Sequence, residues 1–193
     1  AQDNCSGLIY ATTTSPLAYP NQGRYTIVWT YTDANGNKST QNQSIVIKDA
    51  VAPIPDIATL PTINGLCNAT ITAPTAMDNC KGLIIGTTTS PLSYTTQGTR
   101  TITWTYNDGN GNTSTQLQTV IVKDNIAPIP TISILPTISG KCSASVTAPT
   151  AQDNCKGLIT GTTTSPLNYT TQGTRTIIWT YNDGNGNTST QSQ

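Results

Sequence analysis

The sequence repeats itself with a period of 75 residues. Residues 76–118 and 151–193 differ at only five of 43 positions, and the cysteines and tryptophans recur at the same spacing. Such self-similarity predicts a tandem array of equivalent small modules. The recurring positions are Cys5, Cys80 and Cys155; Cys67 and Cys142; and Trp29, Trp104 and Trp179.

About two and a half repeats fit into the 193 residues. We place a partial repeat without its opening strands at 1–49, a complete repeat at 50–124, and a repeat lacking its last strand at 125–193. The joins KDAVAPIP (Lys48–Pro55) and KDNIAPIP (Lys123–Pro130) each contain two prolines. Because proline fixes φ, these linkers should be stiff, and the array should form a semi-rigid rod. We expect the chain to be a window of a longer array.

Strand signals dominate each repeat. Ile102, Trp104 and Tyr106 alternate with threonines, and a period of two places the apolar side chains on one face, toward a core. The same alternation recurs around Trp29 and Trp179, so all three tryptophans are predicted core residues. Further strands are expected at Cys67–Ala73, Leu83–Thr89 and Ser114–Val122, with a weaker one near Ile57–Leu60.

Turn residues separate these strands, and no segment has a helical period. Several short strands in about 75 residues are typical of a small antiparallel β-sandwich. The predicted fold class is therefore all-β, with tandem immunoglobulin-like antiparallel β-sandwiches forming a rod.

Several motifs, in this order, resemble the hyalin repeat (HYR) and its HYR-like relatives. They are CNATITAPTAMDNC, the Gln97-Gly98 turn, TRTITWTYNDGNGNTST and the closing TVIVKD. The resemblance implies immunoglobulin-like modules strung in tandem in an extracellular, cell-surface protein. The Thr-rich, near-identical form is similar to stalks of giant surface and gliding adhesins of Bacteroidetes. Some hyalin-type repeats carry another pair of cysteines on outer strands, which this chain lacks.

The five cysteines suggest disulfides in an exported protein. We expect local pairs, because the seven residues Pro74–Cys80 can run back alongside the preceding strand. The alternative joins neighbouring repeats, for example Cys67 with Cys155, and is favoured if the two cysteines of one repeat lie at its opposite ends. A zinc site is disfavoured, because the chain has neither histidine nor a CxxC spacing. The expected pairs are Cys67–Cys80 and Cys142–Cys155, with the partner of Cys5 outside the chain.

Eight of the nine aspartates fall in three repeated positions: the DNC motif (Asp3, Asp78, Asp153), the D-x-N-G-N stretch (Asp33, Asp108, Asp183) and the linker (Asp49, Asp124). In an immunoglobulin-like tandem, the loop before the last strand lies at the same end of a module as the incoming linker. Asp108 should therefore approach Asp49, and Asp183 should approach Asp124.

Oxygen ligands that converge at a junction suit Ca²⁺. The alternative is that Asp, Asn and Gly only shape hairpin turns. The stretch is not an EF-hand, because Thr113 and Thr119 stand where that loop needs Gly and Glu. The candidate calcium ligands are Asp49, Asp78, Asp108, Asn110, Asp124, Asp153, Asp183 and Asn185.

Several functions are disfavoured by composition. Without His or Glu, no base is evident to activate Ser, Thr or Cys, so an enzyme is not expected. Zero net charge without a basic stripe argues against nucleic acid. No run approaches 18 apolar residues, which argues against a membrane span.

We predict a non-catalytic stalk or filament of a large bacterial cell-surface adhesin, built from neighbouring repeats of the same chain. One alternative is an array that itself binds a surface ligand such as polysaccharide, through exposed tyrosines or threonine rows. In addition, the incomplete terminal repeats could exchange strands head to tail and assemble into fibres.

Overall fold

The computed structural model describes residues 1–5 and 7–193, and among these residues every regular element is a β-strand. The chain forms two compact units. The first comprises Ala1–Ile54, Met77–Ile84 and Asn107–Ser114, and the second comprises Pro55–Ala76, Ile85–Tyr106 and Thr115–Gln193. The predicted all-β, immunoglobulin-like fold class is confirmed, with mostly antiparallel sheets. The predicted repeat boundaries and the rod remain predictions.

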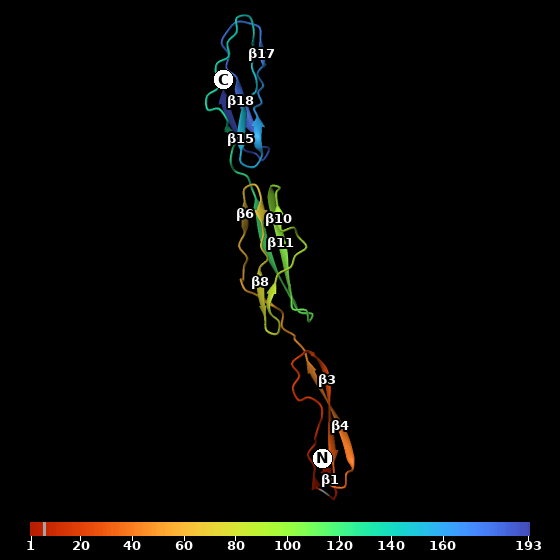
Figure 1. Cartoon of the computed structure of the whole chain (residues 1–193). Coiled ribbons are helices and arrows are strands. Elements are labelled where there is room, and N and C mark those ends of the chain that lie inside the picture. Colours follow the sequence, from red (N-terminus) through yellow and green to blue (C-terminus); the bar gives the residue numbers. More distant parts are fainter. Residues whose placement is uncertain (6) are drawn as a thin grey trace. The chain divides into compact units, whose positions relative to one another are not determined.

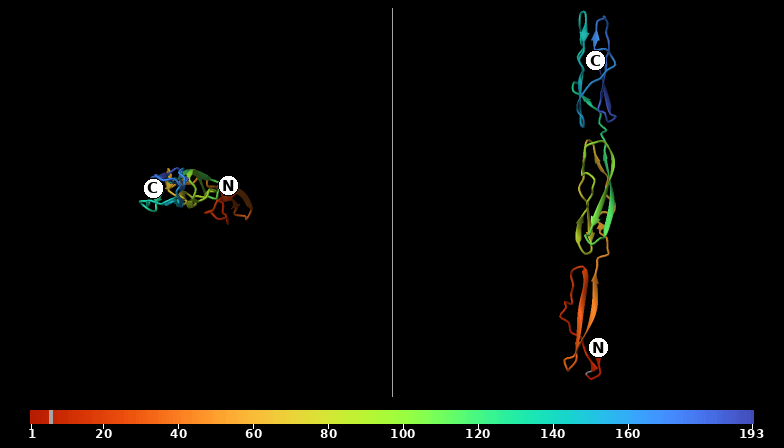
Figure 2. Two further views of the ribbon diagram at one scale, coloured as in Figure 1. Left: turned by 90° about the horizontal axis from the view of Figure 1, so that it is seen from above. Right: turned by 90° about the vertical axis from the view of Figure 1, so that its right-hand side faces the viewer.

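One long hairpin dominates the first unit. Strands β3 (Gly23–Thr32) and β4 (Lys38–Ile47) pair antiparallel along their whole length, from Gly23 opposite Ile47 to Thr32 opposite Lys38. The hairpin can be followed from red to orange in Figure 1 and in the right-hand view of Figure 2. A small hairpin of β1 (Gln2–Asp3) and β2 (Gly7–Leu8) precedes it.

In the second copy of the repeat the strands form three small sheets. The sheet order β11-β12-β6 joins the predicted hairpin to a short parallel strand, and the other two sheets have the orders β5-β8-β9 and β10-β7. The strand bounds are β5 Ile54–Pro55, β6 Ile63–Gly65, β7 Ala69–Thr70, β8 Thr75–Asp78, β9 Gly82–Ile85, β10 Ser93–Tyr94, β11 Gly98–Asn107 and β12 Thr113–Val122.

The third copy repeats most of these pairings within the second unit, drawn from cyan to blue in Figure 1. Its sheets have the orders β13-β15-β16, β14-β17 and β18-β19. The bounds are β13 Ile129–Pro130, β14 Ala144–Ser145, β15 Thr150–Asp153, β16 Gly157–Thr160, β17 Asn168–Tyr169, β18 Ile178–Asn182 and β19 Thr188–Ser192.

The weak strand expected near Ile57–Leu60 is wrong. Those residues bend, and the strand forms instead at β6. Pro55 and Pro61 flank the segment, and proline has no N–H to give to a ladder. A side chain replaces the ladder partner here, because Gln116 Nε2 donates a hydrogen bond to the main-chain oxygen of Ile57 at 2.6 Å.

The inward faces of the β11–β12 and β18–β19 hairpins form the cores of the second and third copies. On β11, Ile102, Trp104 and Tyr106 are at most 1% exposed. Trp104 and Trp179 therefore occupy the predicted core positions. In the third copy, the buried cluster is Ala151, Ile159, Ile177, Trp179 and Tyr181, packed against Leu135, Val146, Ala148 and Tyr169.

Trp29 is only partly buried, which corrects the prediction that it lies in a closed core. In the second copy, Trp104 Nε1 donates to Gln118 Oε1, and Gln118 Nε2 donates to the oxygen of Pro61 in the opening segment of that repeat. In the first copy, Trp29 Nε1 donates to Gln43 Oε1 at 2.8 Å, and this hydrogen bond is exposed.

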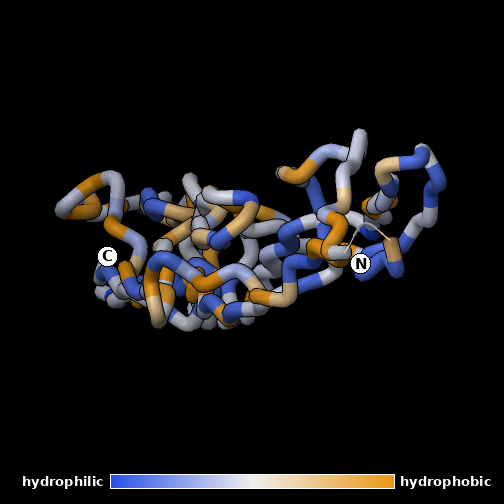
Figure 3. The backbone as a smooth tube through the Cα atoms, turned by 90° about the horizontal axis from the view of Figure 1, so that it is seen from below, coloured by the Kyte–Doolittle hydropathy of each residue, from blue (hydrophilic) through white to orange (hydrophobic). Residues whose placement is uncertain are grey.

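Hydrophobic residues occur in short bands along the backbone, interrupted by polar ones (Figure 3). Among the described residues, no helix is long and apolar enough to span a membrane.

The two tryptophan environments predict different costs for the same truncation. Trp104→Ala should lower the free energy of opening of the β11–β12 hairpin by about 3–5 kcal/mol, because a fully buried indole leaves a cavity. Trp29→Ala should lower that of the β3–β4 hairpin by about 1 kcal/mol. Hydrogen exchange resolved by peptide measures both values, and equal losses would contradict the difference in burial.

Candidate functional site

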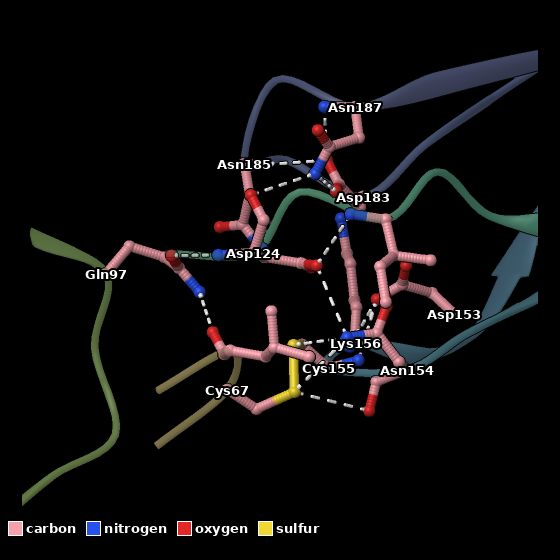
Figure 4. The surroundings of a disulfide bond; sticks show 12 residues. Cys67, Gln97, Asp124, Asp153, Asn154, Cys155, Lys156, Asp183, Asn185 and Asn187 are labelled. Atoms are coloured by element: carbon pink, nitrogen blue, oxygen red, sulfur yellow. Dashed lines mark hydrogen bonds between the residues drawn. A yellow bond between two sulfur atoms is a disulfide. The ribbon is translucent and has the colours of Figure 1, made fainter. Parts of the chain in front are cut away.

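A disulfide joins two successive copies of the repeat. Cys67, just after β6, is bonded to Cys155 in the turn between β15 and β16, with the two Cα atoms 5.0 Å apart and a sequence separation of 88 residues. Figure 4 shows this bond beside a group of aspartates and asparagines. The bond lies within the second unit.

The expected local pairs are therefore wrong, and the alternative across repeats is the one formed. Cys5, Cys80 and Cys142 are exposed and have no disulfide partner within the described residues.

The direction of the chain after the first cysteine of a repeat explains why the predicted local disulfides do not form. From Ala144 to Asp153 it passes through β14 and β15 without an intervening hydrogen-bonded turn. Pro149 also favours an extended residue before it. Nine extended steps cover about 30 Å. A disulfide tolerates a Cα separation of at most about 7 Å, so Cys142 does not reach Cys155.

In the first unit, three aspartates from separate segments meet. Asp49 follows β4, Asp78 ends β8, and Asp108 lies in the turn between β11 and β12. One carboxylate oxygen from each lies within 4.8 Å of the others, and all three residues are at most 4% exposed.

The second unit contains the equivalent group. Asp124 follows β12, Asp153 ends β15, and Asp183 lies in the turn between β18 and β19 (Figure 4). Their oxygens also lie within 4.8 Å of one another, and each residue is 3% exposed. The structure thus brings Asp108 to Asp49 and Asp183 to Asp124. We call the two groups the first and the second aspartate triad.

The D-x-N-G-N stretch folds into a turn around its own aspartate. Asp183 Oδ1 accepts hydrogen bonds from the main-chain N–H of Asn185 at 2.7 Å and of Asn187 at 3.0 Å. Asp183 Oδ2 accepts one from Asn187 Nδ2 at 2.6 Å. Gly186 has a φ of 102°, a conformation that favours glycine.

The equivalent turn in the first copy has the same hydrogen bonds. Asp33 Oδ1 accepts from the main chain of Asn35 and Asn37, and Asp33 Oδ2 accepts from Asn37 Nδ2. Among the described residues, Asp33 belongs to neither aspartate triad. Formation of the turn alone therefore does not assemble a triad.

Asparagine amides connect each turn to the linker. Asn187 Nδ2 donates to the main-chain oxygen of Asp124, and Asn185 Nδ2 donates to Asp124 Oδ2, both at 3.3 Å. In the first unit, Asn112 and Asn110 make the same contacts to Asp49, at 3.3 and 3.5 Å. The predicted ligands Asn110 and Asn185 thus present amide nitrogens to the linker aspartates.

Sequence reasoning missed four residues that build the junctions. Besides Asn112 and Asn187, these are Gln97, whose Oε1 accepts from the Asp124 N–H at 2.7 Å, and Asn154, whose Nδ2 donates to Asp124 Oδ1 at 3.3 Å. Asn112 and Asn187 stand at equivalent positions of the copies, as does Asn154 with Asn79. Their recurrence could have identified them as junction residues, but the same motifs are also typical of ordinary turns.

The aspartate of the DNC motif has one oxygen without a partner. Asp153 Oδ1 accepts from the main-chain N–H of Cys155 at 3.0 Å and of Lys156 at 2.7 Å. Its Oδ2 is buried and makes no hydrogen bond among the described residues, and Asp78 Oδ2 is in the same state. Lys156 Nζ donates to the main-chain oxygen of Asn182 instead. A buried carboxylate oxygen without a hydrogen-bond partner lowers the stability of the folded state.

The triads concentrate negative charge. Burial raises the pKa of Asp108, but hydrogen bonds from Asn110 and Asn112 outweigh it, so the pKa lies below its ordinary value. Asp183 has a lowered pKa for the same reasons, with Asn185 and Asn187 as donors. Charged carboxylates that lie this close together repel one another. What the arrangement can do chemically is hold a hard cation.

The fold and the linker junctions define a protein of tandem immunoglobulin-like modules. Residues 50–122 and 132–193, which together make up most of the chain, match the family described as the HYR-like domain with 4 cysteines. The chain belongs to this family. Each matched segment holds two cysteines, so the chain departs from the four of the family description.

Hyalin from Strongylocentrotus purpuratus is 27% identical over 208 residues. The alignment covers 97% of this chain and 17% of hyalin. The predicted hyalin-type resemblance is confirmed, and the Bacteroidetes context remains a prediction.

The turn chemistry can be tested at Asp33, outside both triads. The side-chain hydrogen bond from Asn37 is the main reason why the pKa of Asp33 lies below its ordinary value. Asn37→Ala should raise this pKa, whereas Asn35→Ala should leave it unchanged because Asn35 donates through its main chain. Carboxyl carbon shifts followed by NMR against pH measure both.

The sign of the linkage follows from the lowered pKa. The ionised Asp33 stabilises the fold above its unfolded pKa, and this contribution is lost as the pH falls through the folded value. An unchanged Asp33 pKa in Asn37→Ala would contradict the assignment.

Proposed function

We propose that the chain is a non-catalytic, structural segment of a large bacterial cell-surface adhesin, whose stalk or filament it extends and stiffens. The observation that carries this proposal is the disulfide between Cys67 and Cys155, which ties one repeat covalently to the next. The disulfide also fits an extracellular location, because such bonds persist in oxidising compartments.

The bond changes how tension travels along the chain. Residues 68–154 form a closed loop that contains the linker Lys123–Pro130 and most of the strands of the second copy. Force applied at the two ends of the chain passes through the sulfur–sulfur bond and bypasses this loop. Unfolding of the second copy therefore cannot lengthen the chain by the loop residues.

The same 88-residue separation between paired cysteines can recur in further repeats. This separation of 88 residues exceeds the 75-residue period by 13, and 13 residues also separate Cys67 from Cys80. Cys80 occupies the position of Cys155 in its repeat, and Cys142 occupies that of Cys67. In an array that continues the period, each pairs with a cysteine 88 residues away in a neighbouring repeat. The covalent path then uses one extended 13-residue segment per repeat.

Single-molecule pulling of the chain between its termini tests this load path. The oxidised protein should release a contour length shorter than that of the reduced protein by the 87 loop residues, or about 300 Å at about 3.5 Å per residue. Cys155→Ser should release the full length without reductant.

Cys80→Ser is the matched control, because Cys80 has no disulfide partner among the residues that the structure describes. It should behave as the unmodified protein does. Equal contour lengths for the unmodified chain and Cys155→Ser would contradict the proposed load path.

A further inference from the structure

We propose that each aspartate triad binds one calcium ion, so that this chain holds two Ca²⁺ at homologous junctions. The first site comprises Asp49, Asp78 and Asp108, and the second comprises Asp124, Asp153 and Asp183. This inference does not depend on the proposed load path, because it rests on the chemistry of the triads alone.

The unpartnered oxygens are the first argument. Asp78 and Asp153 are 4% and 3% exposed, and the Oδ2 atom of each is buried without a hydrogen bond among the described residues. Their Oδ1 atoms are held by main-chain N–H groups of the following turn, which fixes the carboxylates against the other two aspartates. A cation at the triad gives each of these oxygens a partner.

Convergence of three chain segments is the second argument. The first copy has the same aspartate turn, but Asp33 there remains partly exposed and belongs to neither triad. Burial of three carboxylates together therefore goes beyond what the turn requires. It occurs where a linker aspartate arrives, and a bound cation would offset the negative charge that this aspartate adds.

The donor atoms select the ion. Three carboxylates and the nearby main-chain oxygens are hard ligands, whereas zinc in proteins prefers nitrogen and sulfur. Calcium accepts 6–8 oxygens at about 2.3–2.6 Å, so oxygens on its opposite sides lie about 5 Å apart. One carboxylate oxygen from each aspartate of a triad lies within 4.8 Å of the others, a spacing that ligands of a single calcium ion can have. Magnesium needs a tighter octahedron with several retained waters.

Within each site the ligands come from two repeats. Asp49 and Asp124 belong to linkers that end one repeat, and the other two aspartates of each triad belong to the next. A bound ion therefore adds a second connection between successive repeats. At the second site this connection lies beside the disulfide, because the Cys155 N–H donates to Asp153 Oδ1.

Calorimetric titration of the full chain with CaCl₂, after removal of metals with EDTA, tests the number of sites. The unmodified chain should bind two ions, Asp78→Asn and Asp153→Asn one each, and the double variant none. An asparagine keeps the Oδ1 acceptor for the turn and replaces only the unpartnered oxygen. Asp3→Asn is the matched control at the same repeat position outside a triad, and should still bind two.

Thermal melting adds a readout that separates ion binding from misfolding. In EDTA, Asp153→Asn should melt no lower than the unmodified chain, because it removes one of three repelling charges. Excess calcium should raise the melting temperature of the unmodified chain by more than it raises that of Asp153→Asn.

Three results would overturn the proposal. They are no calcium bound at millimolar concentration, loss of an ion in Asp3→Asn, or binding of magnesium as tight as that of calcium. Pulling the chain in EDTA tests the load path without bound calcium, so failure of the load path is distinguishable from failure of the calcium sites.

Discussion

The junction chemistry depends on one geometric constraint, the stiffness of the extended segment between the two cysteines of a repeat. A disulfide forms only between cysteines whose Cα atoms are close together. A segment that runs through two strands without reversing holds the cysteines at its two ends farther apart than that limit. Cys67 therefore bonds to Cys155 in the following copy. The same segment ends at the DNC aspartate, so it also places Asp153 beside the linker that it must meet.

Much of the fold could be predicted because it follows from local periodicity. Alternation around Trp104 and Trp179 predicts the β11–β12 and β18–β19 hairpins and their buried faces, since a strand has only two faces. The meeting of Asp183 with Asp124 could be predicted from tandem topology, because the last hairpin turn and the incoming linker share one end of a module.

The remaining features depend on non-local geometry that local sequence does not encode. Nothing in the sequence around Cys67 distinguishes Cys80 from Cys155 as its partner, because both lie in identical DNC motifs. The partial exposure of Trp29 is not evident from its own strand, because the apolar residues around it alternate as those around Trp104 do. The bridging amides of Asn112 and Asn187 could not be assigned either, because the same asparagines also stabilise the turn itself.

The closed loop has a consequence for survival outside a cell. A protease that cuts once anywhere between residues 68 and 154 opens a peptide bond, but the two fragments remain attached through the sulfur atoms. Exposed stretches within this span, such as residues 136–143, are therefore places where a single cut does not part the chain. Severing it there requires both a protease and a reductant, and an oxidising environment does not supply the second.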